Sequence, residues 1–369
     1  MTGHRTLLFA LAYLAGALLA GGAEPAEMPW IAIDSAGTGF SRDGEAPFRV
    51  WGFNYDHDAQ GRLIEDYWEE EWKTVVGDFR EMKALGANAV RVHLQVAKFI
   101  ESPDRPNEAA FKRLGRLVRL AERTGLYLDI TGLGCYHKQD VPAWYDALGE
   151  QERWAVQALF WKSTARTCAA SPAILCYDLM NEPILPGAGK PETEWLAGEF
   201  GGKHFVQRIT LDLADRTREQ VARAWVDLLV STIREEDKRH LITVGVIPWA
   251  MVWPNAKPFF NSPEVGKNLD YVSAHFYPKK GEVDKALQAL KVYDIGKPLV
   301  VEEMFPLACG LEELNAFIDG SRDFVDGYIG FYWGKTIEEY ASEEKLDIGG
   351  AIMKGWLEYF QAKAPEMTN

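Results

Sequence analysis

The sequence predicts an α/β protein, a (β/α)8 barrel with a small N-terminal β-hairpin. Eight short segments rich in apolar, β-branched and aromatic residues alternate with amphipathic helical stretches, which is the pattern of a parallel barrel. Gly86 and Gly125 each stand where a helix would end before the next strand. No Ser/Pro-rich linker or internal repeat divides residues 24–369, so we expect one catalytic domain.

Each expected element follows from this alternation. The expected strands are 49–54, 89–93, 126–131, 173–181, 241–246, 271–276, 299–303 and 328–333, and the expected helices are 67–85, 107–124, 151–170, 221–238, 285–292, 311–320 and 351–362. Segments 30–33 and 48–50 flank a Gly/Asp-rich region and predict a hairpin that covers the bottom of the barrel. The longest loops follow the fourth and fifth strands, on the face where barrels carry their sites.

Residues 1–23 have the pattern of a cleavable signal peptide. His4 and Arg5 precede an apolar stretch from Leu7 to Leu19, and small residues follow up to Ala23. The alternative is a retained membrane anchor, but the stretch is shorter than the ~20 residues that a spanning helix needs. We therefore expect a secreted or periplasmic protein without a membrane segment after cleavage.

Charge and cysteine content narrow the possible partners. The formal net charge is -14, which argues against nucleic acid or an anionic membrane surface, because both are held by concentrated basic surface. The four cysteines (Cys135, Cys168, Cys176 and Cys309) allow three full pairings. Their connectivity and the oligomeric state stay open, and a free apolar thiol is at least as compatible with the strand position of Cys176 as a bridge.

Two carboxylates are the principal candidates for chemistry. The tripeptide Asn181-Glu182-Pro183 ends the fourth expected strand, and Glu303 ends the seventh. Both therefore point into the mouth of one barrel. Two carboxylates there suit glycoside hydrolysis, in which one acts as proton donor and the other as nucleophile, about 5–5.5 Å apart when configuration is retained.

The same segments resemble glycoside hydrolase family 5, the cellulase and mannanase family of clan A. Besides Asn181-Glu182-Pro183 and the segment 297–304, the first, second, sixth and eighth strands carry matching motifs, and the resemblance spans about 30–359. These motifs are Gly52-Phe53-Asn54-Tyr55, Asn88-Ala89-Val90-Arg91-Val92, His275-Phe276-Tyr277 and Tyr332-Trp333.

The resemblance implies a role for each matching residue. Glu182 would be the acid/base and Glu303 the nucleophile. The supporting residues would be Arg91 (orienting the nucleophile), Asn181 (bonding the sugar 2-hydroxyl), Tyr277 (bonding Glu303), His275 (beside the acid/base) and Trp333 (flooring the subsite of the cleaved sugar). No metal or organic cofactor is implied.

Glu302 competes with Glu303 for the role of nucleophile. The family pattern selects Glu303, which follows three apolar strand residues and one further residue. Alternation along the strand predicts that only one of these two neighbours faces the site. We therefore expect Glu303 to face the substrate.

One position departs from the family pattern. The family usually carries a histidine at the tip of the third strand, where this chain has Thr131. His137, six residues later, is the candidate to replace it, although a loop histidine is more often exposed or a substrate contact.

Two further groups of residues are open to interpretation. Asp56-His57-Asp58, with His137 and Asp140, invite a metal-hydrolase reading, but subsite hydrogen bonding is the better hypothesis. Loop aromatics offer flat faces for sugar stacking, and we expect about half of them to serve the loops' own cores instead. These aromatics are Trp144, Tyr145, Trp195, Trp249, Trp253, Phe259 and Phe260.

The sequence therefore predicts an exported, retaining glycoside hydrolase that acts on an oligo- or polysaccharide, namely a β-linked glucan, mannan or related glycoside. Two alternatives are a carbohydrate-binding barrel without turnover and, less favoured, a metal-dependent hydrolase. The sugar, the linkage and the choice between internal and terminal cleavage depend on loop shape, which the sequence does not give.

Overall fold

A computed structural model describes residues 28–254 and 256–368. The predicted signal peptide, residues 1–23, lies outside the described residues. The chain first forms a three-stranded antiparallel sheet of β1 (Ile31–Ile33), β2 (Phe40–Arg42) and β3 (Ala46–Phe48). The predicted hairpin is thus present and carries a third strand.

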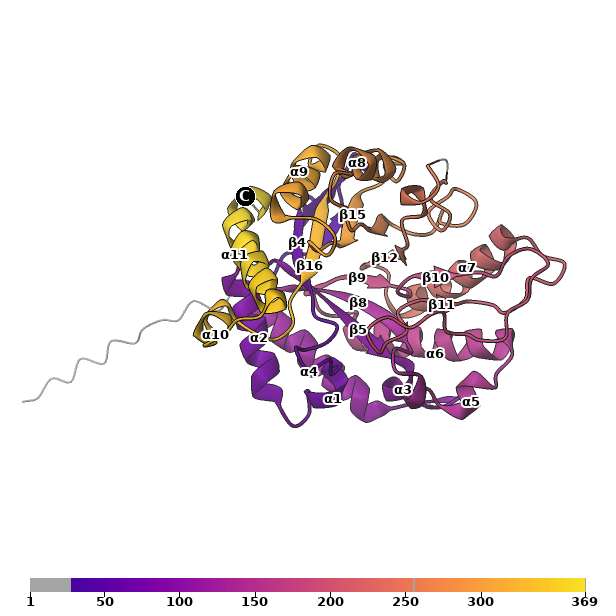
Figure 1. Cartoon of the computed structure of the whole chain (residues 1–369). Coiled ribbons are helices and arrows are strands. Elements are labelled where there is room, and N and C mark those ends of the chain that lie inside the picture. The colour runs from indigo at the N-terminus through magenta and orange to yellow at the C-terminus, as the bar shows by residue number, and fades with distance from the viewer. Residues whose placement is uncertain (1–27, 255, 369) are drawn as a thin grey trace, which may run out of the picture.

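All eight predicted barrel strands are present, and they surround a common axis with the helices outside (Figure 1). The sheet has the order β12-β9-β8-β5-β4-β16-β15-β14-β13, and all neighbours are parallel. Its strands are β4 (Val50–Asn54), β5 (Ala89–Gln95), β8 (Tyr127–Gly134), β9 (Ile174–Asp178), β12 (Leu241–Thr243), β13 (Gly245–Val246), β14 (Val272–His275), β15 (Leu299–Glu303) and β16 (Gly327–Phe331). Because β12 and β13 are the two halves of the predicted fifth strand, separated only by Val244, the sheet closes on itself.

The predicted helices form between these strands. The long helices are α2 (Trp72–Ala84), α4 (Glu108–Thr124), α6 (Glu150–Cys168), α7 (Arg218–Glu236), α8 (Val283–Lys291), α9 (Leu311–Ser321) and α11 (Ile348–Thr368). Shorter elements are α1 (Ile64–Tyr67), α3 (Val96–Phe99), α5 (Ala143–Asp146), α10 (Ile337–Ser342), the 3-10 turns η1 (Lys138–Asp140) and η2 (Trp249–Met251), and the strand pairs β6 (Ile100–Ser102) with β7 (Arg105–Pro106) and β10 (Pro183–Ile184) with β11 (Gln207–Arg208).

The residues at the two ends of helix α4 explain where this helix begins and ends. The side chain of Asn107 accepts hydrogen bonds from the backbone N–H groups of Ala109 and Ala110, and Gly125 ends the helix in the left-handed conformation (φ 67°). An N-terminal amide cap and a C-terminal glycine satisfy the backbone groups that a helix leaves free at its ends.

The small N-terminal sheet covers the bottom of the barrel. The ring of Phe40 packs edge-on against Tyr271 with a centroid distance of 5.3 Å, and Phe48 packs in the same way against Tyr127 at 5.2 Å. Tyr127 and Tyr271 lie at or just before the N-terminal ends of their strands. This end of the barrel is therefore closed by apolar packing, and the C-terminal ends remain for a site.

Among the residues that the structure describes, no helix is both long and apolar enough to span a membrane. The four cysteines all fall within this part of the chain and are free thiols. Cys135, Cys168 and Cys176 are buried, and the hydroxyl of Tyr271 donates to the sulfur of Cys176 at 3.0 Å.

Helix α11 packs against the outer face of the barrel, and one of its contacts restricts the residue type on strand β16. The indole N–H of Trp356 donates to the carbonyl of Phe331 at 2.8 Å, and its ring lies directly on Gly330. A Cβ atom at position 330 would lie 2.0 Å from the nearest indole carbon. Position 330 is therefore restricted to glycine by this helix.

We expect Gly330→Ala to lower the free energy of unfolding by about 2–3 kcal/mol, because the added methyl group displaces a fully buried indole ring. Thermal and urea denaturation measure the loss.

Gly77→Ala is the matched control. Gly77 lies on the exposed face of helix α2, and a Cβ there meets nothing within 4 Å, so this variant raises the free energy of unfolding by about 0.5–1 kcal/mol. Equal stability of the two variants would contradict the packing account.

Candidate active site

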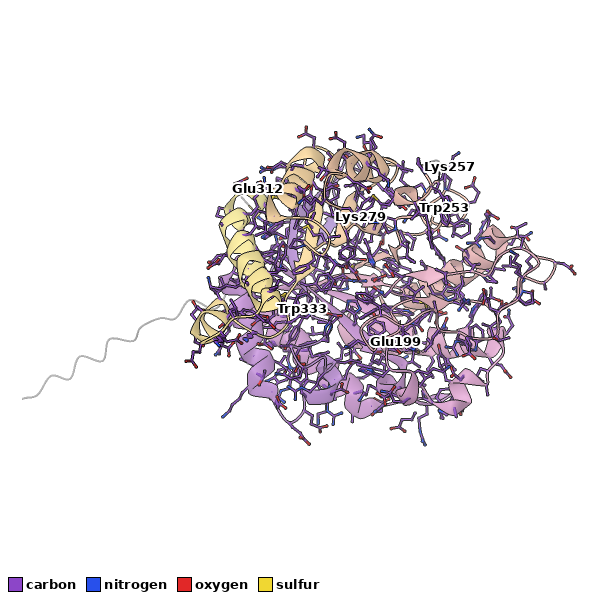
Figure 2. All side chains as sticks on the ribbon, viewed as in Figure 1. Glu199, Trp253, Lys257, Lys279, Glu312 and Trp333 are labelled. Atoms are coloured by element: carbon purple, nitrogen blue, oxygen red, sulfur yellow. The ribbon has the colours of Figure 1, made fainter. Side chains whose placement is uncertain are left out.

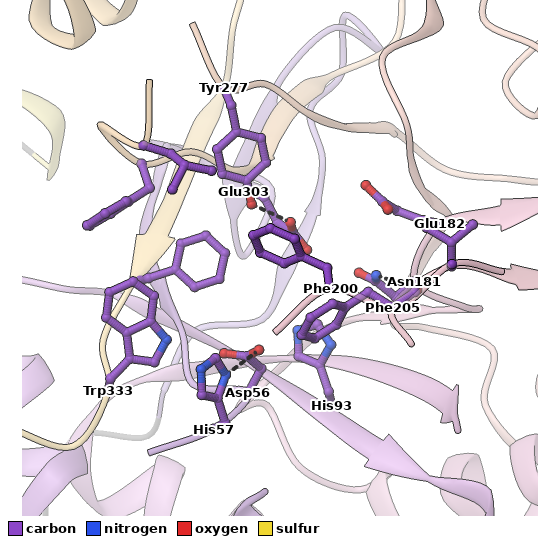
Figure 3. A pocket seen from close by; sticks show the side chains of 15 residues that line it. Asp56, His57, His93, Asn181, Glu182, Phe200, Phe205, Tyr277, Glu303 and Trp333 are labelled. Atoms are coloured by element: carbon purple, nitrogen blue, oxygen red, sulfur yellow. Dashed lines mark hydrogen bonds and ion pairs between the residues drawn. The ribbon is translucent and has the colours of Figure 1, made fainter. Parts of the chain in front are cut away.

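A cavity of about 320 Å³ opens at the C-terminal ends of the barrel strands. Figure 3 shows its side chains converging from several strands and loops. The lining residues are Asp56, His57, His93, Asn181, Glu182, Gly198, Phe200, Phe205, Val206, Tyr277, Glu303, Phe305, Leu307, Phe331 and Trp333.

Glu182 and Glu303 face each other across this cavity. Glu182 follows β9, Glu303 ends β15, and their side chains are 17% and 12% exposed. One carboxylate oxygen of each lies within 4.8 Å of the other. This separation agrees with the ~5–5.5 Å between carboxyl groups that retaining glycosidases use.

Glu182 has an unusual backbone conformation for its residue type. Its φ of 47° lies in the left-handed region, which a residue with a long side chain rarely adopts. The conformation is held because the backbone N–H of Glu182 donates to the carbonyl of Gly245 at 2.9 Å and Pro183 follows directly. The strand end thus directs this carboxylate into the cavity.

Glu303 accepts hydrogen bonds from two donors. Arg91 Nη1 donates to Glu303 Oε1 at 2.7 Å, and the hydroxyl of Tyr277 donates to Oε2 at 2.6 Å. Burial and the negative charge of Glu303 raise the pKa of Tyr277 well above its usual value. Tyr277 therefore keeps its proton and remains a donor to Glu303.

His275 contacts the other carboxylate. Its Nδ1 lies 2.8 Å from Glu182 Oε1 and 3.5 Å from Glu303 Oε2. Burial lowers the pKa of His275, but the charge of Glu303 and the hydrogen bonds with Glu182 and Glu302 outweigh burial and raise it to about 10. The ring is therefore an imidazolium at neutral pH and donates to Glu182.

Arg91 joins the two halves of the site. The guanidinium is fully buried, and besides Glu303 it binds three polar side chains. It donates from Nη2 to Asp178 Oδ2 at 2.8 Å and to Asn181 Oδ1 at 2.8 Å, and from Nη1 to Asn54 Oδ1 at 3.0 Å. Asn181 lines the cavity as well, so Arg91 orients a candidate sugar-binding amide together with Glu303.

Of the two adjacent acids only Glu303 lines the cavity, as expected, but the regular alternation on which that expectation rested does not hold. Glu302 is fully buried below the cavity, where its Oε2 lies 3.6 Å from Arg91 Nη2, while Glu303 lines the cavity and also binds Arg91. The reason is an irregularity between β14 and β15: Ala274 pairs with Val301, but His275 pairs with Glu303. The skipped residue interrupts the alternation and turns both carboxylates inward.

His137, the candidate to replace the third-strand histidine, does not line the cavity. His137 precedes η1 and lines a separate small hollow with Gln95 and Asp140. Thr131 donates to Asp178 at 2.8 Å and so supports Arg91 indirectly.

A different histidine, His93, lines the cavity. It pairs with Thr131 in the sheet, one strand away. Burial, followed by the charge of Arg91, lowers the pKa of His93 well below its usual value, so the ring is neutral. The sequence indicates this position of His93, because His93 lies two residues after Arg91 and residues two apart on a strand share a face.

Asp56, His57 and Trp333 form one wall of the cavity (Figure 3). His57 Nδ1 lies 2.8 Å from Asp56 Oδ2, and the rings of His57 and Trp333 are 6.0 Å apart. Within the described residues, Asp56 Oδ1 and Trp333 Nε1 are buried without a hydrogen-bond partner. These two atoms are available to sugar hydroxyl groups.

The aromatic loop residues proposed for stacking do not line this cavity. Tyr145, Trp195 and Phe260 are buried in loop cores, and Trp253 is exposed at the periphery of the molecule while Trp333 lies nearer its middle (Figure 2). The cavity rings are instead Phe200, Phe205, Tyr277, Phe305, Phe331 and Trp333. Phe200, 70% exposed, directly precedes a Gly201-Gly202 turn in the long loop after β9.

The donor atoms of Glu182, His275 and Glu303 all lie within 4.8 Å of one another and are of types that bind divalent cations. However, His275 carries a proton toward Glu182, and a cation would first have to displace it. Asp56 and His57 line the cavity, whereas His137 and Asp140 line the other hollow. The arrangement suits proton transfer better than metal binding.

A parallel barrel with two carboxylates at this spacing is the arrangement of retaining glycoside hydrolases. The family model described as cellulase (glycosyl hydrolase family 5) matches residues 45–304. The chain therefore belongs to glycosyl hydrolase family 5, a family of retaining glycoside hydrolases, as its resemblance implied.

Solved structures show the same fold at low sequence identity. The exo-β-1,4-mannosidase Op5Man5 from Opitutaceae bacterium strain TAV5 matches 91% of this chain with a TM-score of 0.66 and 20% identity, and this chain spans 62% of its length. The catalytic domain of Thermobifida fusca endoglucanase Cel5A matches 87% of this chain and 95% of its own (TM-score 0.57, 16% identity). The β-1,4-mannanase from Aplysia kurodai matches 82% and 92% (TM-score 0.56, 15% identity). A search of curated proteins found no match.

We expect Tyr277→Phe to lower kcat by about tenfold to a hundredfold, because the variant removes a hydrogen bond to a charged carboxylate. Steady-state kinetics on an aryl β-glycoside measure the change.

Tyr328→Phe is the control. Tyr328 is a buried tyrosine whose hydroxyl is hydrogen-bonded to Ser321 and to a backbone carbonyl, away from the cavity. It should reduce stability and leave kcat unchanged; similar losses of kcat in both variants would argue against a role for Tyr277 in holding Glu303.

Proposed function

We propose that this protein hydrolyses β-1,4-linked mannosides with retention of configuration. The observation that carries the hydrolytic mechanism is the pair Glu182 and Glu303, close together but with different partners. Glu303, bound by Arg91 and Tyr277, attacks the anomeric carbon, and Glu182 protonates the departing glycosidic oxygen. In the second step Glu182 removes a proton from water, which releases the sugar from Glu303.

The surrounding residues support binding of one sugar at the reacting position. Asn181 lines the cavity beside Glu182, and Asp56 Oδ1 and Trp333 Nε1 offer one acceptor and one donor. The rings of Trp333 and Phe331, stacked with centroids 5.4 Å apart, present an apolar floor that suits the C–H face of a pyranose.

The choice of mannose follows from the fold relatives. Op5Man5 is named an exo-β-1,4-mannosidase, the Aplysia protein a β-1,4-mannanase, and a Bifidobacterium longum structure at 14% identity contains Manβ1-4GlcNAc. The Thermobifida endoglucanase supports glucans as the competing class. The sugar is therefore the part of the proposal that a substrate panel decides.

A panel of aryl β-mannoside, aryl β-glucoside, β-1,4-mannan and β-1,4-glucan, with product analysis, tests the substrate. We expect the highest kcat/KM on a mannose-containing substrate and full activity in EDTA. Preference for the glucose series would replace mannan by glucan, loss of activity in EDTA would favour the metal-dependent alternative, and binding without turnover on every substrate would favour the carbohydrate-binding alternative.

Glu303→Ala tests the nucleophile. We expect kcat to fall by on the order of a thousandfold or more, because no carboxylate remains to attack the anomeric carbon. Azide, which fits the vacated space, should restore turnover and give a glycosyl azide of inverted configuration. Near-normal activity without azide would reject Glu303 as nucleophile.

Glu312→Ala, which changes an exposed glutamate at the start of α9, is the control. It should behave like the parent with and without azide.

We also propose that the protein is exported with removal of residues 1–23. The basic start, the apolar stretch and the small residues up to Ala23 support this proposal. N-terminal sequencing of the protein from the periplasm or medium should begin near residue 24; an intact N-terminus retained in the membrane fraction would reject cleavage.

A further inference from the structure

Glu302 is a buried charge to which the hydrolytic steps assign no task. Its side chain is fully buried, and its Oε1 accepts a hydrogen bond from the hydroxyl of Ser273 at 2.9 Å. Its Oε2 lies 3.4 Å from His275 Nε2 and 3.6 Å from Arg91 Nη2. Because a carboxylate removed from water is costly, its retention in the barrel centre requires charged partners, and these two groups supply them.

His275 connects Glu302 with Glu182. Nδ1 of the ring lies 2.8 Å from Glu182 Oε1, and Nε2 faces Glu302 Oε2 on the opposite side. A neutral imidazole has one N–H and donates on one side only, whereas the imidazolium donates on both sides. The placement of a carboxylate at each nitrogen therefore favours the charged ring.

Gly245 keeps this group compact. A Cβ atom at position 245 would lie 2.4 Å from Glu302 Oε2, 2.8 Å from His275 Nε2 and 3.1 Å from Arg91 Nη2. The three charged side chains thus pack on a strip of backbone without a side chain. The carbonyl of Gly245 also accepts the hydrogen bond from the backbone N–H of Glu182. Gly245 therefore contacts the Glu302–His275 pair and also fixes the backbone of the acid/base residue.

We propose that Glu302 is a positioning residue that holds His275 as an imidazolium, so that the ring keeps a donor directed at Glu182. This inference rests on the proposed role of Glu182. Glu302 reaches the substrate only through His275, since it does not line the cavity.

The charged groups around His275 determine the direction of the effect. Glu302 and Glu303 on β15 and Glu182 after β9 favour the protonated ring, whereas Arg91 on β5 opposes it. His93 is neutral.

Behind Glu302 lie Asp129 and Asp178. Burial and the charge of Glu302 raise the pKa of Asp129, and Asp178 is bound to Arg91. Removal of the charge of Glu302 therefore makes loss of the proton from His275 easier.

Glu302→Gln tests the proposal, because glutamine keeps the size of the side chain and an acceptor for Ser273. In nitrogen-15 histidine NMR, with the His275 signal assigned by its loss in His275→Asn, we expect the titration midpoint to fall by about one pH unit or more. The alkaline limb of kcat should move to lower pH, with KM within about twofold, since the substrate contacts are unchanged.

Asp237→Asn is the matched control. Asp237 is a buried carboxylate bonded to His240 and Tyr177 near the opposite end of the barrel. This variant should lose stability while the His275 midpoint and the pH profile of kcat remain those of the parent.

An unchanged His275 midpoint in Glu302→Gln overturns the proposal, and so does a loss of kcat with an unchanged pH profile. If circular dichroism shows that this variant does not fold, Gly245→Ala takes its place, because the added methyl group separates Glu302 from His275; the same fall in midpoint is expected, and its absence is equally decisive. The titration needs no substrate, so its result is independent of whether the protein hydrolyses the proposed glycosides.

Discussion

The structure depends above all on the buried guanidinium of Arg91. A cation without contact with water is costly unless its charge is matched by neighbouring groups. Asp178, Glu302 and Glu303 supply the charge, and Asn54 and Asn181 supply neutral acceptors. These partners come from different strands, so the cation can be satisfied only when the barrel is closed. The same contacts orient a catalytic carboxylate and a neighbouring amide, which joins folding of the barrel to assembly of the site.

The functional groups occur where the regular sheet is interrupted. The break after β12 places Gly245 against Glu302 and His275, and the register shift between β14 and β15 turns two consecutive glutamates inward. A regular strand would direct one of these glutamates toward the helices. The irregularities therefore concentrate more charged groups in the barrel centre than eight ideal strands would allow.

Much of the fold and part of the candidate site were predictable from the sequence, and the features that were not predictable have a physical explanation. Strand order, helix positions and the facing pair of Glu182 and Glu303 follow from local patterns, because hydrophobic periodicity and strand ends are encoded locally. The inward direction of Glu302 was not predictable, because a bulge arises from pairing with a neighbouring strand rather than from the strand's own residues.

Two histidines differ in how far the sequence predicts their positions. His93 was predictable from its spacing to Arg91, because residues two apart on a strand share a face. The location of His137 depends on how a loop settles against Gln95 and Asp140, which no local pattern specifies. The cavity rings likewise come from loop residues such as Phe200 rather than from the most conspicuous tryptophans.

The left-handed backbone of Glu182 has a consequence for how this family member can change over time. Glycine and asparagine adopt such a conformation at much lower cost than glutamate. The residues that fit this backbone conformation at the lowest cost thus lack a group that can transfer a proton to a sugar. Selection for hydrolysis and selection for stability oppose each other at this one residue, and a descendant relieved of the need for turnover would gain stability by giving up its acid while the barrel around it stayed intact.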